Sequence, residues 1–176
     1  GLIARLAGRR CRLHGQAPAR VQRPLKKAQA MTPQQTAELV RDGMFARDRA
    51  AQSLAMRITH IAPGEATIEM AVRDDMLNGF DTCHGGFITT LGDTAFAYAC
   101  NTRNELTVAS GLSVDFVAPG RPGDVLVAEA KELSQAGRTG VYDVTIRNRQ
   151  GQLIALFRGK SYSMKGKPTV PDASAQ

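Results

Sequence analysis

One short segment of the chain combines the residue types that acyl-transfer chemistry requires. It holds Asn78, His84 and two adjacent glycines, Gly85 and Gly86, directly before an apolar stretch. Backbone N–H groups at the start of a helix favour a developing negative charge. Within the apolar stretch, Asp93 is a lone carboxylate, a costly placement unless the acid has a partner or a function. Together these residues predict chemistry at an acyl carbonyl.

The spacing of Gly85 and Asp93 limits how they can act. Eight residues of one helix separate them, about 12 Å at roughly 1.5 Å per residue. Catalytic contacts require heavy atoms within about 3 Å of each other. If both groups act on one substrate, they must come from two chains, so the spacing predicts an active site across a dimer interface.

Each residue has a chemical role and a structural alternative. The Gly85 N–H would polarise the carbonyl and stabilise the oxyanion, because no Cβ obstructs the approach of substrate. Asp93 would act as nucleophile or as general base, or would be a buried acid satisfied by backbone or Thr hydroxyls. Asn78 would orient water or the thioester, or would form a plain turn. His84 would assist proton movement or shape the loop.

Length and cysteine content define the general class of protein. The 176 residues correspond to one domain with enough apolar content for a core. No apolar run approaches the length of a transmembrane helix, so we expect no membrane partner. The three cysteines (Cys11, Cys83 and Cys100) favour a reduced, cytoplasmic protein over a disulfide scaffold.

The basic charge of the chain is concentrated in its first 30 residues. The net charge is +7, but residues 1–30 hold eight basic residues and no acid, and the remainder is close to neutral. We expect residues 1–30 to be a disordered basic leader. A transit peptide, an arm for nucleic acid or membrane surfaces, and sequence preceding a natural start at Met31 all remain open. The body shows no nucleic-acid-binding motif, and we expect no nucleic-acid partner.

Hydrophobic periodicity predicts an α+β domain over residues 31–166, with a flexible tail over 167–176. A helix is expected from Thr32, an N-cap followed by Pro33, to about Met56. A second, central helix is expected over residues 84–100. Strands are expected over residues 54–62, 66–72, 107–117, 124–133, 140–148 and 153–164. The short connections favour an antiparallel sheet wrapped around the central helix.

The central helix has two distinct faces at helical spacing. One carries the side chains that we expect to pack against the sheet: Phe87, Leu91, Ala95 and Tyr98. The other is small and polar enough for a ligand or another backbone: Gly86, Thr90, Asp93 and Ala97.

The combination Asn78…His84-Gly85-Gly86…Asp93-Thr94 resembles the hotdog-fold acyl-CoA thioesterases, and within them the phenylacetate-degradation (PaaI-type) family. The resemblance covers roughly residues 35–165. It implies a hotdog fold, edge-to-edge dimers and commonly homotetramers. It also implies hydrolysis of aryl- or phenylacetyl-type CoA thioesters, such as hydroxyphenylacetyl-CoA, without a metal or redox cofactor.

The resemblance also assigns roles to individual positions. Asp93 matches the catalytic acid, Gly85 the oxyanion donor, and Asn78 and His84 the supporting loop residues. CoA phosphates need cations, and two pairs of residues, Arg138 with Thr139 and Arg158 with Lys160, lie on late strands where the family places its nucleotide contacts. The expected substrate and CoA contacts are Gly86, Thr94, Arg138, Thr139, Arg158 and Lys160, with Arg103, Arg121 and Lys165 as looser candidates.

Other chemistries fit the residues less well. Cys83 and His84 are adjacent, so they do not aim at each other as a nucleophile and base would. His14, His60 and His84 are scattered and no two cysteines show ligand spacing, which argues against a metal site. A hotdog hydratase or dehydratase remains an alternative enzyme, although the paired glycines and Asn78 favour carbonyl attack. A non-enzymatic acyl-CoA-binding protein would not need Asp93.

Overall fold

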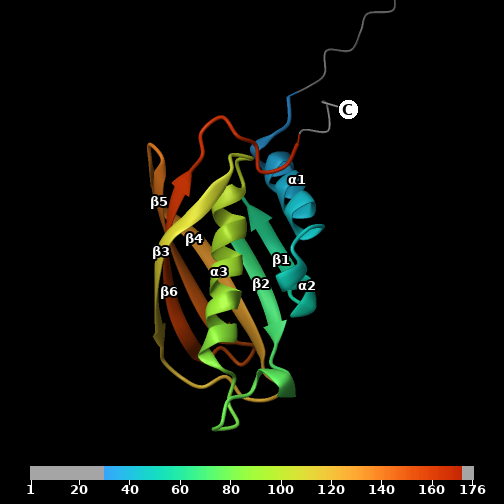
Figure 1. Ribbon diagram of the computed structural model, residues 1–176, viewed down its shortest axis with the longest axis vertical. Helices are drawn as coiled ribbons and strands as arrows, with labels where there is room; N and C mark the ends of the chain where they lie inside the picture. Colours follow the sequence, from blue (N-terminus) through green and yellow to red (C-terminus); the bar gives the residue numbers. More distant parts are fainter. Residues whose placement is uncertain (1–29, 172–176) are drawn as a thin grey trace, which may run out of the picture. The chain divides into compact units, whose positions relative to one another are not determined.

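The computed structural model describes residues 30–171, so the predicted disorder of the leader lies outside the described residues except for Ala30. Its strands form one sheet in the order β1-β2-β4-β5-β6-β3. The strand bounds are β1 (Arg57–Ala62), β2 (Glu65–Ala71), β3 (Thr107–Phe116), β4 (Val125–Ala136), β5 (Thr139–Asn148) and β6 (Leu153–Ser163). Each neighbouring pair is antiparallel. The helix α3 (Gly85–Asn101) lies along one face of this sheet (Figure 1).

This arrangement confirms the predicted α+β hotdog architecture, and the strand predictions agree with the structure to within about three residues. Period-two patterns locate the strands because one face of the sheet is buried against α3. On β6, Phe157 and Ser161 are buried toward the helix side, whereas Arg158 and Lys160 are exposed on the other face. The two faces of the sheet therefore carry different chemistry.

Two glycines allow the helix and the sheet to approach closely. A Cβ at Gly92 of α3 would lie 2.9 Å from Cδ2 of Phe157 on β6. A Cβ at Gly159 would lie 2.7 Å from the ring of Phe96. The Phe96 ring instead packs edge-on against Tyr142, with ring centroids 5.4 Å apart. Of the face predicted to pack against the sheet, Leu91, Ala95 and Tyr98 are buried and Phe87 is partly buried. The Tyr98 hydroxyl donates to Asp48 at 3.3 Å, next to α2 (Arg49–Ser53).

The single helix expected from Thr32 to Met56 is wrong, because the chain forms two helices there. Helix α1 (Pro33–Phe45) begins at the capping box of Thr32 and ends at Ala46. Helix α2 (Arg49–Ser53) begins anew at Asp48, whose carboxylate accepts from the Ala51 N–H at 3.0 Å. The Phe45 carbonyl accepts from the Gln52 side chain at 2.6 Å and from the Asp48 N–H at 3.2 Å. These local hydrogen bonds replace the helical ones at the break.

The tail expected to be flexible from residue 167 is instead packed over residues 167–170, which we call the C-terminal strap. Figure 1 shows this segment running from β6 to α1. Val170 is 3% exposed, and its N–H donates to Asn104 Oδ1 at 2.9 Å. The carbonyl of Lys167 accepts from the Leu106 N–H at 2.8 Å. Gly43 of α1 admits Val170, because a Cβ there would lie 2.5 Å from Val170 Cγ1.

The strand β3 closes one end of the sheet and is paired only with β6 among the described strands. It exposes apolar side chains at Val108, Leu112 and Phe116. An unpaired strand edge bearing apolar groups is a ready site for pairing with another chain. In the described part of the chain, no helix has the length and apolar character needed to cross a membrane.

Candidate active site

The loop before α3 is ordered by the side chain of Asn78. Its Oδ1 accepts from the backbone N–H groups of Phe80 at 2.9 Å and Thr82 at 3.3 Å, and from the Thr82 hydroxyl at 3.2 Å. A backbone bond from the Asn78 N–H to the Thr82 carbonyl closes the loop at 2.8 Å. Asn78 thus has the turn-forming role, and its amide nitrogen remains available to a ligand, because the described residues do not accept from it.

His84 caps the helix that follows this loop. The Nδ1 atom of its ring accepts from the Gly86 N–H at 3.0 Å. The backbone N–H of His84 donates to the Met76 carbonyl at 2.8 Å. The loop-shaping role of His84 is therefore present, and the imidazole is held as an acceptor at Nδ1. Since the Gly86 N–H is taken by the cap, Gly86 itself offers no backbone donor to a substrate.

The Gly85 N–H is the free donor at the N-terminus of α3. Among residues 30–171, no hydrogen bond uses it. It lies in a hollow that is also lined by Asn78, Ile88 and Phe116. The helix dipole adds positive potential at this end. The arrangement provides one backbone donor beside an amide side chain, as stabilisation of an oxyanion requires.

Replacing His84 tests the cap. His84→Ala is expected to lower the free energy of unfolding by about 1 kcal/mol, because the Gly86 N–H loses its acceptor. His84→Asn retains a side-chain acceptor of the type that N-caps prefer and is expected to recover most of the loss. Urea unfolding of the three proteins measures this. Equal stability of the alanine variant and the native protein would show that the cap does not stabilise the fold.

Asp93 lies half-buried on the second face of α3, where the sequence predicted it. None of the described residues forms a hydrogen bond or ion pair with its carboxylate, which rules out in this chain the alternative of an acid satisfied by backbone or Thr hydroxyls. The hydroxyls of Thr90 and Thr94 instead donate to helix carbonyls, Thr94 to that of Thr90 at 2.7 Å. Burial raises the pKa of Asp93 above its ordinary value.

Asp93 opens into a groove that runs beside the C-terminal half of α3. Its walls include Phe96 and Ala97 of the helix, Val108 of β3 and Thr169 of the strap. The groove therefore combines mostly apolar walls with one carboxylate that lacks a partner within residues 30–171. A carboxylate in such a setting suits a general base or nucleophile.

The raised pKa of Asp93 has a consequence for stability. Between its ordinary value of 3.8 and the raised value, the folded protein binds more protons than the unfolded chain. The free energy of unfolding therefore falls as the pH rises through this window. Asp93→Asn is expected to raise the melting temperature at neutral pH, with the difference vanishing below pH 3.8. Thermal melts across this range measure it, and Asp74→Asn, at an exposed carboxylate, is expected to show no such gain.

Gly85 and Asp93 line different hollows in the chain. The hollow at Gly85 and the groove at Asp93 share no residue among those that line them. The axial separation predicted from the sequence is thus present in the fold, where α3 is continuous from one group to the other. One chain supplies two half-sites, and the described residues do not bring them together.

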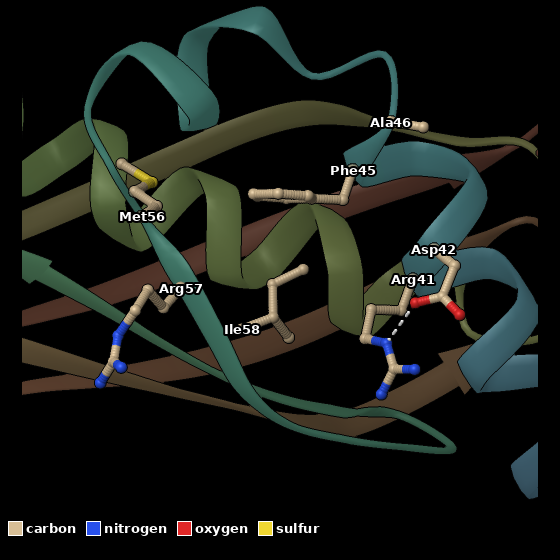
Figure 2. A pocket seen from close by; sticks show the side chains of 7 residues that line it. All are labelled: Arg41, Asp42, Phe45, Ala46, Met56, Arg57 and Ile58. Carbon is tan, nitrogen blue, oxygen red and sulfur yellow. Dashed lines mark hydrogen bonds and ion pairs between the residues drawn. The ribbon is translucent and has the colours of Figure 1, made fainter.

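A further hollow lies between α1 and β1 and is shown in Figure 2. It is lined by Phe45, Met56 and Ile58, with Arg41 donating to Asp42 at its rim at 2.7 Å. None of the predicted site residues lines it. We therefore assign it no part in the chemistry of the carbonyl.

The cations predicted for CoA phosphates lie on the face of the sheet opposite α3 or at its end. Arg158 forms a two-pronged ion pair with Asp143, at 2.6 and 2.8 Å. Lys160 is exposed two residues along β6 and forms no ion pair with the described residues. Neither lies beside Asp93 of its own chain, because the sheet stands between them.

The remaining candidates differ in how far they are already engaged. Arg138 lies over the ring of Tyr162, 6.0 Å from its centroid, and the Thr139 hydroxyl donates to the Ala136 carbonyl at 3.1 Å. Arg103 is held by Glu132 through two hydrogen bonds of 2.6 and 2.9 Å, an engagement similar to that of Arg158 with Asp143. The side chains of Arg121 and Lys165 form no ion pair within residues 30–171.

The Cys83–His84 pair does not form a nucleophile and base. The Cys83 thiol is buried and donates weakly to the His84 carbonyl at 3.8 Å, and burial raises its pKa to about 11. A thiol with a raised pKa is a poor nucleophile. The described residues contain no group of three or more His, Cys, Asp or Glu side chains that could hold a metal ion.

Comparison with known proteins connects this geometry to a family. The thioesterase superfamily matches residues 80–155, which include Gly85 and Asp93. Acyl-coenzyme A thioesterase PaaI of Escherichia coli (strain K12) is 45% identical over 126 residues, which are 72% of this chain and 90% of that protein. The chain belongs to the PaaI-type thioesterase family. It is a thioester hydrolase.

Solved structures of PaaI proteins also support the membership of this thioesterase in the PaaI-type family. The E. coli PaaI protein from the phenylacetic acid degradation operon superposes with a TM-score of 0.76 at 42% identity, covering 77% of this chain and 99% of that one. A variant of PaaI from Thermus thermophilus superposes with a TM-score of 0.63 at 38% identity, covering 65% of this chain and 98% of that one. The family and fold expected from the motif are confirmed.

The sequence did not point to several residues that line the hollows at Gly85 and Asp93. Thr169 of the strap and Val108 of β3 line the Asp93 groove. Phe116 covers Gly85, where a Cβ would lie 2.8 Å from its ring. The sequence provides no signal for Val108 and Phe116, because β3 shows no alternation of buried and exposed residues, and none for Thr169, because the composition of its segment favours a tail.

Proposed function

We propose that this thioesterase hydrolyses aryl- and phenylacetyl-type CoA thioesters, hydroxyphenylacetyl-CoA among them, to the free acid and CoA in phenylacetate catabolism. The observation that carries the proposal is Asp93, an unpartnered, half-buried carboxylate with a raised pKa in an apolar groove of the described chain. An apolar groove suits an aryl group. The E. coli relative is named an acyl-coenzyme A thioesterase, and the solved E. coli PaaI protein comes from a phenylacetic acid degradation operon; both names agree with this substrate class.

The reaction needs an oxyanion donor and an acid–base group. The Gly85 N–H donates to the thioester oxygen as the carbonyl carbon becomes tetrahedral. Asp93 either takes a proton from the attacking water or attacks the carbonyl itself to form a mixed anhydride, which water then hydrolyses. In the general-base route, collapse of the oxyanion breaks the C–S bond and gives the acid directly. In the nucleophile route, the same collapse gives the mixed anhydride, and its hydrolysis gives the acid. In both routes the CoA sulfur leaves as a thiolate and takes up a proton to become the free thiol. No metal or redox cofactor takes part in these steps.

The two half-sites require a second copy of the chain. Gly85 of one subunit would meet Asp93 of another, in a dimer or in a homotetramer made of two dimers. The unpaired edge of β3, which exposes Val108 and Leu112, offers a surface for pairing and borders the Asp93 groove. A subunit placed there would also cover the apolar edge.

The supporting groups follow from the same arrangement. Asn78 orients water or the thioester through its free amide nitrogen, and His84 holds the helix start. Arg138 with Thr139, and Arg158 with Lys160, would contact the CoA phosphates from a neighbouring subunit, because the sheet separates Arg158 and Lys160 from Asp93 of their own chain. We propose a cytoplasmic location, which the low number of cysteines favours.

A hydrolysis screen tests the substrate class. Phenylacetyl-, hydroxyphenylacetyl-, benzoyl- and fatty acyl-CoA are compared by release of free thiol, and aryl thioesters are expected to have the highest kcat/KM. A hydratase would consume an enoyl-CoA without releasing thiol. A binding protein would bind acyl-CoA without turnover. Faster hydrolysis of long fatty acyl-CoA than of the aryl thioesters would contradict the aryl assignment.

A further inference from the structure

The C-terminal strap reaches the groove of Asp93 through Thr169. The Thr169 hydroxyl donates to Asn101 Oδ1 at 2.8 Å, and its carbonyl accepts from Arg47 Nη2 at 3.2 Å. Arg47 in turn donates through Nε to the Gly43 carbonyl of α1 at 3.3 Å. Thr169 is thus held from α3 on one side and from the end of α1 on the other.

These contacts leave Thr169 with an apolar surface for a ligand. Its hydroxyl proton and its carbonyl are both engaged, so the side chain has no free donor, and its γ-methyl group is apolar. Thr169 lines the same groove as Asp93. Asn101, which holds it, is the last residue of α3 and follows Asp93 by eight positions, about 12 Å along the axis. The groove therefore runs from the carboxylate to a methyl-bearing wall.

The occupant that suits this groove is the acyl group rather than the CoA end of the substrate. Between Asp93 and Thr169 the walls include Phe96, Leu106 and Val108. The one cation among the described residues that line it, Arg47, already donates to two carbonyls, those of Gly43 and Thr169. A phosphate needs free cationic donors, whereas an aryl ring or an alkyl chain needs apolar contact.

We propose that Thr169 is the far wall of the acyl groove and that the C-terminal strap sets the largest acyl group that the enzyme accepts. The proposal rests on the acyl-CoA hydrolysis proposed above. Arg47 and Asn101 act as positioning residues, because they hold the strap and leave the reacting atoms to Asp93 and Gly85. The strap contacts α1, α3 and the groove at once, so its position defines the length of the groove.

Enlarging Thr169 tests the wall. Thr169→Phe places a ring in the groove and is expected to lower kcat/KM for phenylacetyl-CoA about tenfold or more relative to acetyl-CoA. Lys167→Phe is the matched control, since it adds the same ring to an exposed position of the strap that does not line the groove. Its ratio of the two kcat/KM values is expected to equal that of the native protein.

Binding of non-hydrolysable thioether analogues of acetyl- and phenylacetyl-CoA, measured by calorimetry, separates this proposal from the proposed function. If the native enzyme hydrolyses acyl-CoA but Thr169→Phe affects both acyl sizes equally, the strap proposal is wrong and the function stands. If no acyl-CoA is hydrolysed but Thr169→Phe selectively weakens the larger analogue, the function is wrong and the wall stands. Absence of both turnover and binding overturns both.

Arg47→Met tests the hold on the strap. Loss of the guanidinium is expected to raise the KM for phenylacetyl-CoA several-fold with little change in kcat, and to increase hydrogen exchange over residues 167–171. Arg47→Lys, which keeps one donor, is expected to recover part of the KM. Arg49→Met is the control, because Arg49 is exposed and does not line the groove. An equal fall in kcat and kcat/KM for Arg47→Met would contradict a positioning role.

Discussion

Asp93→Asn is expected to lower kcat by about 10²- to 10⁴-fold while leaving the oligomer folded and able to bind CoA. The amide keeps the shape of the side chain but cannot take a proton or attack a carbonyl. Because no described residue bonds the carboxylate, the change also breaks no internal contact. Steady-state thiol release and CoA titration measure the two effects separately.

The control for Asp93→Asn is Asp74→Asn, which removes one exposed negative charge and is expected to leave kcat unchanged. Turnover of Asp93→Asn near the native level would contradict the catalytic assignment. Pre-steady-state kinetics of the native enzyme then distinguishes the two roles of Asp93. A burst of thiol release would indicate the mixed anhydride, which accumulates if its hydrolysis is slow.

Gly85→Ala is expected to lower kcat about 10²- to 10³-fold, the usual effect of losing one oxyanion donor. The added methyl group would stand beside the free N–H and obstruct the approach of the carbonyl. It would also lie 2.8 Å from the ring of Phe116 and displace it. Steady-state kinetics with phenylacetyl-CoA measures the loss.

Phe116→Ala separates obstruction of the N–H from the packing clash. In the double variant Gly85→Ala with Phe116→Ala, the clash is absent but the methyl group still blocks the N–H. We expect the double variant to stay as slow as Gly85→Ala. Recovery of activity would show that Gly85 serves only the packing of Phe116.

The two half-sites also predict complementation between subunits. Oligomers that mix Asp93→Ala chains with Gly85→Ala chains should regain measurable activity, because some sites then combine an intact Asp93 with an intact Gly85. Native mass spectrometry confirms that hybrids form. Hybrid oligomers without any regained activity would rule out the two-chain site.

Local patterns were sufficient to predict most of the elements. Period-two alternation located β2, strand-type composition between turn signals located the other strands, and the apolar run from His84 located α3. The same logic placed Asp93 on a different face of α3 from Leu91, Ala95 and Tyr98. These predictions depend on neighbouring residues only, and the structure agrees with them.

Two predictions differ from the structure, one at a local helix break and one at a contact between distant residues. The helix expected to continue to Met56 ends at Phe45, because Asp48 and Gln52 satisfy the backbone at the break. Of the tail expected to be flexible, residues 167–170 are packed, because Val170 fits against Gly43, which is far from it in the sequence. The proline, lysine and serine content of this segment favours a frayed end. Composition alone does not predict a contact with Gly43, which is far from Val170 in the sequence.

Residue types and their spacing were enough to predict the chemistry and its division between two chains. A glycine at a helix start and a carboxylate eight residues later follow from residue type and helical rise, which are local properties. The surroundings of those groups became visible only in the folded chain: Phe116 over Gly85, no described partner for Asp93, and Thr169 at the end of its groove. Burial and groove walls arise where distant segments pack together, and the hydrophobic periodicity of a sequence does not predict which distant segments will do so.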